Sequence, residues 1–431
     1  MNRFGVVRDS PFTSFSYNIN NSSFEFALTS VFYINEWKKS LVQIGYFKKS
    51  FFDYELKIGR WHQDISSESI LSSGSLIRGN NNIPIPQISL NIPKYKKYKI
   101  LNHNLWIKAG FSHGWFSKGE YINPPYLHEK FLYIKKIINN NNEISLGLVH
   151  EAIWGGKTIS HGNQPESFKD YLRVIFALPA SNTGSLGDQK NAIGNHLGIW
   201  DLSYSKKYLN KIINFYYQHP FEDKSGAFQH FFDELKRLTL TSKSFDGLFG
   251  IEIKNNMANF ISIFLYEYLN TTYQSGSSPQ SDSSYGWDSY YNHYLYSTGW
   301  TYKGGSISNP LFTLGRLDKE GDYVSNNRIR AHHIGLKGSL SNKVKHKFFF
   351  TFSKNYGTYW DRHLFKNKEK TYKYVSGLNQ FSALIQLDFI NLIRNANITF
   401  SYAIDRGDVI KNSKGFQLSI NYNFSNLSYS K

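Results

Sequence analysis

The sequence predicts an all-β protein, a single transmembrane antiparallel β-barrel, and three observations favour this fold. Apolar and polar residues alternate in many segments, the alternation continues along most of the 431 residues, and aromatic residues gather near the segment ends. Successive side chains of a strand point to opposite faces, so alternation gives one apolar and one polar face. A barrel in an outer membrane needs that arrangement, with apolar side chains toward lipid. A soluble sandwich shows the same period, but repetition along the chain favours the barrel.

The predicted strands follow from this period of two. In chain order, the clearest segments are 24–29, 42–46, 105–112, 144–149, 171–176, 200–204, 381–389, 398–404 and 416–424. The last segment is the most regular, because five apolar residues from Phe416 to Phe424 alternate with four polar ones. Composition does not change abruptly anywhere, so we expect residues 1–431 to form one barrel domain.

Two connecting regions are expected to have structure of their own. The segment 65–92 contains Gly74, Gly79, Pro84 and Pro86 and is too long for a hairpin turn, so it is expected to fold into the lumen. Its apolar residues need cover from water; they are Ile70, Leu71, Leu76, Ile77, Ile83 and Ile85. The insertion 220–244 has apolar residues at helical spacing, which predicts a short helix near 228–238.

Composition excludes several classes of protein. Hydrophobic residues make up 40% of the chain, the mean hydropathy is −0.45, and no apolar run approaches the roughly 20 residues of a spanning helix. Aromatic residues reach 17%, which suits a barrel with aromatic girdles at the membrane interfaces. Without cysteine, the chain offers no thiolate metal site and no disulfide.

The net charge of +18 limits the possible partners. Nucleic acid binding would need a basic cluster on one element, whereas the lysines here are scattered in short pairs between strand-like segments. Outer-membrane lipid, lipopolysaccharide and an acidic polysaccharide fit such a distribution. No apolar leader follows Met1, so a barrel in the bacterial outer membrane requires this chain to be the mature form.

No catalytic motif is evident. His128-Glu129 and His150-Glu151 resemble the start of a zinc-protease helix, but neither pair is followed by the second histidine, and both lie in strand-like sequence. We therefore expect no cofactor, no metal and no enzyme activity. Several strings instead mix polar and aromatic residues, such as 194–201, 290–294, 326–333 and 405–408. They are interpreted either as polar networks that brace the barrel interior or as a wall that faces carbohydrate.

These strings belong to a series of motifs in which the chain resembles the Wzi-like capsule assembly proteins, in the branch found in Bacteroidetes. The motifs include ELKIGR at 55–60, PIPQI at 84–88, HGWF at 113–116, LHEK at 127–130, GNHLG at 194–198, DGLFG at 246–250, YNHY at 291–294, GWTY at 299–302, NPLF at 309–312 and DRGD at 405–408. The resemblance spans roughly residues 55 to 424. Enterobacterial members carry an N-terminal helical bundle, whereas strand-period sequence begins here by Phe24, so no such bundle is expected.

The resemblance implies an outer-membrane barrel of about 18 strands (16–18) that binds and organises surface polysaccharide without turnover. A sugar-binding wall would combine aromatic faces with charge-assisted hydrogen bonds. The candidate polar contacts are Arg173, His196, Asn292, His293, Arg328 and Arg406, and the candidate stacking faces are Trp200, Tyr291 and Trp300. Two alternatives stay open: an accessory subunit of a larger outer-membrane complex for secretion, insertion or nutrient uptake, and a diffusion porin. An occluded lumen would disfavour the porin.

Overall fold

A computed structural model gives the fold of most of the chain. It describes residues 12–21, 24–33, 41–63, 66, 68–79, 81–117, 123–158, 161–222, 227, 246–257, 260–274, 289–317, 321–358, 376–393, 396–410 and 412–422. Within these ranges the protein is almost entirely β, with two short helices, α1 (Phe168–Ile175) and α2 (Leu186–Lys190). Neither helix is long and apolar enough to cross a membrane.

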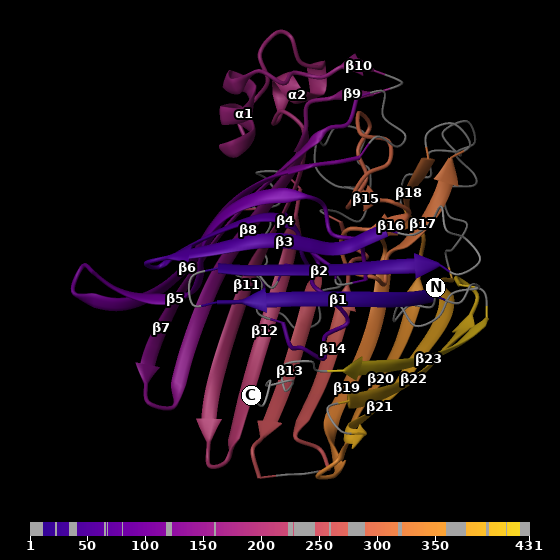
Figure 1. Cartoon of the computed structure of the whole chain (residues 1–431). Coiled ribbons are helices and arrows are strands. Elements are labelled where there is room, and N and C mark those ends of the chain that lie inside the picture. The colour runs from indigo at the N-terminus through magenta and orange to yellow at the C-terminus, as the bar shows by residue number, and fades with distance from the viewer. Residues whose placement is uncertain are drawn as a thin grey trace, which may run out of the picture.

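One large antiparallel sheet of seventeen strands dominates the structure (Figure 1). Each strand pairs with the next in the chain order β1 (Phe12–Asn20), β2 (Phe24–Tyr33), β3 (Leu41–Phe51), β4 (Tyr54–Arg60), β5 (Gln87–Ile100), β6 (His103–Trp115), β7 (Tyr126–Asn139), β8 (Asn142–Trp154), β11 (Asn195–Tyr208), β12 (Lys211–Phe221), β13 (Gly247–Asn255), β14 (Ile263–Asn270), β19 (Ile329–Ser341), β20 (Val344–Asn355), β21 (Leu378–Ile393), β22 (Ala396–Gly407) and β23 (Ser413–Tyr422). This number lies within the predicted range of 16 to 18.

Six short strands form three small two-stranded sheets in the connections. These pairs are β9 (Lys157–Thr158) with β10 (Gly162–Asn163), β15 (Thr301–Tyr302) with β16 (Gly305–Ser306), and β17 (Thr313–Leu317) with β18 (Gly321–Asn326). They lie at the same end of the large sheet as α1 and α2, at the top of Figure 1.

The two ends of the large sheet differ in the length of their connections. At the short-turn end, neighbouring strands are joined by two residues at 52–53, 101–102, 140–141, 209–210 and 342–343. At the long-connection end, the joining segments include 61–86, 155–194 and 271–328. In Figure 1 the hairpins β7–β8, β11–β12 and β19–β20 turn at the bottom, β3–β4 and β5–β6 turn at the left, and the helices and small sheets lie in the upper part.

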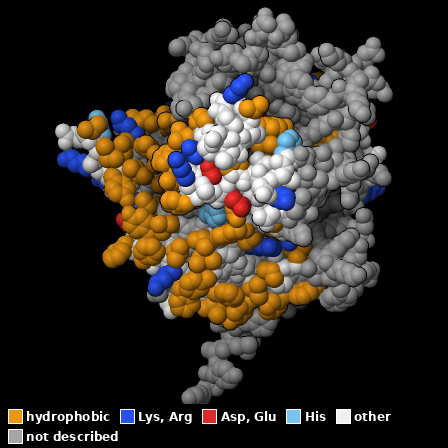
Figure 2. Space-filling view, turned by 90° about the horizontal axis from the view of Figure 1, so that it is seen from above, with side chains coloured by type: hydrophobic (Ala, Val, Ile, Leu, Met, Phe, Trp, Pro, Cys, Tyr) orange, Lys and Arg blue, Asp and Glu red, His pale blue; other side chains and the backbone are white. Residues whose placement is uncertain are grey.

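The two faces of the large sheet have opposite character. We call inner the face against which segment 61–86 packs, and outer the opposite face. On β23, the outward side chains of Phe416, Leu418 and Ile420 are 56%, 57% and 62% exposed, while Gln417 and Ser419 point inward. The predicted alternation is therefore confirmed from Phe416 to Ile420. Seen from the long-connection end, hydrophobic side chains gather along the left and lower sides, and polar ones lie toward the middle (Figure 2).

Aromatic rings lie flat on the inner face where the neighbouring strand carries glycine. Tyr133 is directly opposite Gly147, and a Cβ on that glycine would come within 2.1 Å of the ring. Tyr216 lies opposite Gly250 in the same way, at 2.0 Å. The absence of a side chain at these two glycines is thus required for the rings to pack against the sheet.

Two local predictions have different outcomes. The predicted strand at 171–176 is wrong, because these residues belong to helix α1 and its C-terminal cap. Ser167 caps this helix: its Oγ accepts from the Asp170 N–H, and the Asp170 carboxylate accepts from the Ser167 N–H. Six residues are too few for alternation to distinguish a strand from an amphipathic helix. The predicted helix near 228–238 lies outside the described residues.

Candidate functional site

The connection 61–86 fills much of the space inside the sheet, and we call its described residues 66–86 the plug. Leu71, Leu76 and Ile77 are completely buried in a hydrophobic core that they share with residues of the inner face. The predicted inward fold is correct for these residues and for Ile85, which is also buried. Ile70 lies on the inside as well, where it lines a cavity, but it lacks the expected cover, because it is 69% exposed. The predicted segment 65–92 is also too long, because β5 begins at Gln87.

Carboxylates of the wall hold the backbone of the plug. Glu267 accepts hydrogen bonds from the Ser72 hydroxyl at 2.5 Å and the Ser73 N–H at 2.7 Å. Glu252 accepts one from the Ser69 hydroxyl. Backbone groups in a segment without regular secondary structure must find partners when buried, and these inward side chains supply them.

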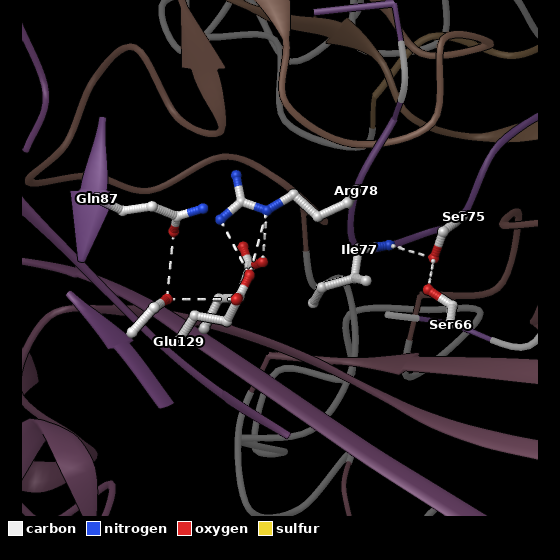
Figure 3. A network of polar contacts seen from close by, with 8 residues as sticks. Ser66, Ser75, Ile77, Arg78, Gln87 and Glu129 are labelled. Carbon is white, nitrogen blue, oxygen red and sulfur yellow. Dashed lines mark hydrogen bonds and ion pairs between the residues drawn. The ribbon is translucent and has the colours of Figure 1, made fainter. Parts of the chain in front are cut away.

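An arginine of the plug neutralises two wall carboxylates (Figure 3). Glu129 and Glu151 lie directly opposite each other on β7 and β8, and both are almost completely buried. Arg78 Nε lies 2.7 Å from Glu151 Oε1, and Arg78 Nη2 lies 3.2 Å from Glu129 Oε2. Two buried carboxylates on directly opposite residues would repel each other strongly without a cation between them. The plug is therefore fixed electrostatically as well as by packing.

The plug leaves part of the interior open. A cavity of about 370 Å³ lies between the plug and strands β20 to β23. Hydroxyl and amide side chains dominate its inner-wall lining, which includes Thr351, Gln386, Thr399, Ser401, Gln417 and Ser419. Lys347 supplies a single ammonium group. We call this space the polar chamber; its lining can hydrogen-bond to water or to a hydroxyl-rich ligand.

An exposed aromatic patch lies at the long-connection end, where 155–194 meets 271–328. Tyr294 is 48% exposed, and its ring centroid lies 5.8 Å from that of His161 and 4.8 Å from that of His293. We call these three residues the loop-end patch. Its position is fixed by the hydroxyl of Tyr294, which lies 2.5 Å from Ser185 Oγ at the start of α2. A Cβ at Gly187 would lie 2.4 Å from that hydroxyl, so only glycine permits this close approach.

Two buried carboxyls support the connections at this end. Asp246 accepts from the backbone N–H groups of Tyr273 and Gln274, at 3.0 and 2.6 Å, and burial raises its pKa to about 7. Burial likewise raises the pKa of Asp188, on α2, to about 6. Burial disfavours the charged form of a carboxyl, so these groups keep their protons at a higher pH than usual.

Three of the predicted ligand contacts serve the interior of the 271–328 connection. Tyr291 and Trp300 are completely buried, so neither ring has a face available for stacking. The Tyr291 hydroxyl donates to the Leu76 carbonyl of the plug at 3.0 Å. Asn292 exchanges two hydrogen bonds with the backbone of Val324, at 2.8 and 3.2 Å. Their geometry matches the bracing network, one of the two interpretations of these strings.

The other predicted contacts are dispersed. His196 and Trp200 lie on the outer face of β11, with His196 buried and bonded to His150 at 2.8 Å. Arg173 lies on α1 and forms an ion pair with Asp170 at 3.2 Å. Arg328 Nε lies 3.5 Å from the Thr272 carbonyl. The last, Arg406, is exposed at the long-connection end of β22. Of the nine predicted residues, His293 alone belongs to the loop-end patch.

Sequence reasoning missed the residues that build the interior. Neither Glu129 nor Glu151 is among the predicted site residues, although their strand period places them on the same face as Leu127 and Ile153. Two acidic residues on an inner face indicate that a cation must approach. No periodic pattern identifies Arg78 as that cation, because it lies in an irregular connection.

A large antiparallel sheet with an apolar outer face and a filled interior is typical of outer-membrane β-barrels, and comparison with known proteins supplies the family. The sequence profile of the family described as capsule assembly protein Wzi matches residues 15–315. The chain belongs to this family, and it is a protein of the bacterial outer membrane. No curated protein matches the chain by sequence.

One solved structure shows the same fold, and two others are less similar. The Escherichia coli protein described as Wzi, an outer membrane protein involved in group 1 capsule assembly and a carbohydrate-binding β-barrel, aligns over 95% of this chain and 77% of its own, with a TM-score of 0.59 and 14% identity. OccK5 of Pseudomonas aeruginosa aligns over 95% of this chain and 91% of its own, with a TM-score of 0.45 and 10% identity. OccK10 of the same organism aligns over 96% and 92%, with a TM-score of 0.44 and 9% identity.

Proposed function

We propose that this protein is a single closed transmembrane barrel that binds and organises surface polysaccharide by binding alone, without catalysis. Membership of the capsule assembly family supports this function, as does the description of the Escherichia coli relative as a carbohydrate-binding barrel. The ordered motifs from 55 to 408 support placing the chain in the branch found in Bacteroidetes. In outer-membrane barrels the short turns face the periplasm and the long connections face outward, which directs the loop-end patch toward the cell surface.

The observation that carries the proposal is an exposed aromatic patch above a filled interior. Tyr294 presents a ring face on which a sugar can stack, and the imidazoles of His161 and His293 can donate to or accept from sugar hydroxyls. The net charge of +18 favours an acidic polysaccharide among surface glycans. Outer-membrane lipid and lipopolysaccharide are the further partners of the outer face.

The test is binding of acidic and neutral polysaccharides to the purified full chain, measured by isothermal calorimetry. Replacing Tyr294 with alanine should weaken binding by about 1 kcal/mol, or about fivefold in Kd, because a stacking face is lost. The matched control is Tyr208→Ala, which removes a tyrosine that is 58% exposed near the short-turn end. This control should bind as the unmodified protein does, and binding of acidic glycans should weaken with added salt.

The alternative functions predict different results. The plug argues against a diffusion porin, so the pure protein should give little or no steady conductance in planar bilayers. Absence of polysaccharide binding, combined with stoichiometric co-purification of other outer-membrane proteins, would favour an accessory subunit of a larger complex. Equal affinities of Tyr294→Ala and the unmodified protein would remove the loop-end patch from the binding site.

A further inference from the structure

Helix α1 has an apolar stripe that no described residue covers. Phe168 and Leu172 are four residues apart, and Phe176, the C-terminal cap, follows four residues later. Residues at this spacing share one face of a helix. Their side chains are 76%, 41% and 66% exposed. The other apolar side of the helix is occupied, because Val174 is completely buried and the Tyr171 ring stacks on Trp154 at 4.9 Å.

The helix lies against the outer face of the large sheet. The Tyr171 ring centroid lies 6.5 Å from that of Phe111, on β6, and 5.7 Å from that of His128, on β7. The side chains of Phe111 and His128 point outward, because the next residue on each strand, Ser112 and Glu129, points to the plug side. Lys130 Nζ donates to the carbonyl of Ile175, the last residue of α1. The end of the helix is therefore fixed beside Lys130 on the outside of the wall.

The apolar belt of the outer wall begins just below this contact. The next outward side chain after Lys130 on β7 is Leu132, which is 45% exposed, and Ile134 follows at 37%. Strands rise about 3.3 Å per residue, so Leu132 lies only about 7 Å further along the strand. The C-terminal end of α1 therefore lies close to the surface that a barrel presents to lipid.

Charges next to the stripe suit a membrane interface. Lys169 and Lys190 are exposed in the same segment. The acidic residues of the two helices are buried and bonded: Asp170 to Ser167 and Arg173, and Asp188 to the Gly194 N–H at 3.4 Å. Helices that lie in a membrane interface combine an apolar face with lysine and arginine at its border.

The size of the stripe favours lipid over a protein partner. Three side chains of this size offer on the order of 500 Å². A specific protein interface needs roughly 800 Å² on each partner. Insertion among acyl chains has no such threshold, because each buried apolar group contributes in proportion to its area.

We propose that α1 is an interfacial anchor whose stripe of Phe168, Leu172 and Phe176 is buried in the outer leaflet. Its occupant is lipid at the boundary between headgroups and acyl chains. His161 of the loop-end patch belongs to the same connection as the helix, 155–194, and Ser185 of that connection bonds to the Tyr294 hydroxyl, so the anchor also sets the height of the patch above the membrane. This inference concerns the outer wall and does not depend on polysaccharide binding.

The chain has no cysteine, which permits site-directed spin labelling of single positions. Nitroxide labels at Phe168→Cys and Phe176→Cys would be compared in full-length protein reconstituted in vesicles of phosphatidylethanolamine and phosphatidylglycerol. The readout is the collision rate with oxygen, which is enriched in lipid, and with a water-soluble nickel chelate. Leu132→Cys serves as the lipid-facing control and Lys169→Cys as the water-facing control on the same helix.

Both stripe labels should lose nickel collisions and gain oxygen collisions relative to Lys169→Cys, and they should approach the behaviour of Leu132→Cys. Nickel access equal to that of Lys169→Cys would overturn the proposal, since the stripe would then face water. Low access to both reagents would also overturn it, because it would indicate cover by protein, such as a second copy. Phe168 and Phe176 are exposed, so neither replacement should disturb the fold, and heat-modifiable migration on gels would confirm this.

Discussion

The two halves of the interior differ in the partners that their acidic side chains have. On β7 and β8, Glu129 and Glu151 depend on the plug, because Arg78 is the cation that separates them. On β21 and β22, the acids are satisfied within the wall: Asp388 accepts from Gln386 and Thr399, and Asp405 accepts from Ser382 and Ser413. The first half is filled and the second keeps the polar chamber. Where the acidic side chains of the wall accept enough hydrogen bonds from neighbouring wall residues, the interior can stay hydrated. Where such donors do not suffice, a cation from the plug is required.

The largest loss of stability is expected when the ion pairs of the filled half are removed. Replacing Arg78 with alanine leaves two buried carboxylates without their cation, which should lower the free energy of unfolding by about 3–5 kcal/mol. Guanidinium unfolding in detergent, followed by tryptophan fluorescence, measures this loss. Planar-bilayer conductance should rise in the same variant as the plug loosens. Adding Glu129→Gln and Glu151→Gln should restore much of the stability, and an unchanged midpoint in Arg78→Ala would refute the dependence on this arginine.

A smaller loss of stability is expected when a larger side chain is introduced into one half of the interior or the other. Valine at Gly250 would collide with the Tyr216 ring, which donates to Glu267 beneath the plug, and should cost about 1–3 kcal/mol. The matched change is Ser419→Val, which adds bulk to the lining of the polar chamber and should cost within about 0.5 kcal/mol. Similar losses in both variants would mean that the two halves are equally packed.

A pH-dependent effect is expected from the Asp246 carboxyl at the edge of the filled half. Its pKa of about 7 in the folded protein exceeds the ordinary value of 3.8, so the folded state keeps a proton that the unfolded state has lost. Stability should therefore fall as pH rises from about 4 to about 7 and change no further from this source. Denaturant midpoints across this range should show a weaker fall in Asp246→Asn. A slope identical to that of the unmodified protein would assign the pH dependence to other groups.

The sequence allowed the wall to be predicted better than its contents. Alternation at 416–424 predicted the last strand and which of its side chains point outward, because in a barrel wall each side chain faces either lipid or the lumen. The same signal failed at 171–176, where a serine cap and packing on the outer wall produce a helix. Inward folding of the plug was predicted from Leu71 and Leu76, since apolar groups need cover. The ion pairs of Arg78 were not predicted, because their carboxylates lie on two strands that are distant from it in the sequence.

The candidate site was predicted only in part, for a related reason. His293 was selected from a string of polar and aromatic residues, and it belongs to the loop-end patch. Tyr291, from the same string, turns into the core. Tyr294, the next residue after His293, belongs to the patch but is not among the predicted contacts. In an irregular connection no period distinguishes inward from outward side chains, so neighbouring residues could not be sorted.

The distance in sequence between the plug and its partners has a consequence for biogenesis. Strand neighbours along the wall are neighbours in the chain, so the wall can grow by successive hairpins. The plug follows β4, yet Ser69 bonds to Glu252, which is 183 residues later, and the Leu71 carbonyl bonds to His333, which is 262 residues later. Closing such long loops is entropically costly until intervening structure forms. We therefore expect the plug to dock late, after β19 has joined the wall, so that its docking would mark a nearly completed assembly.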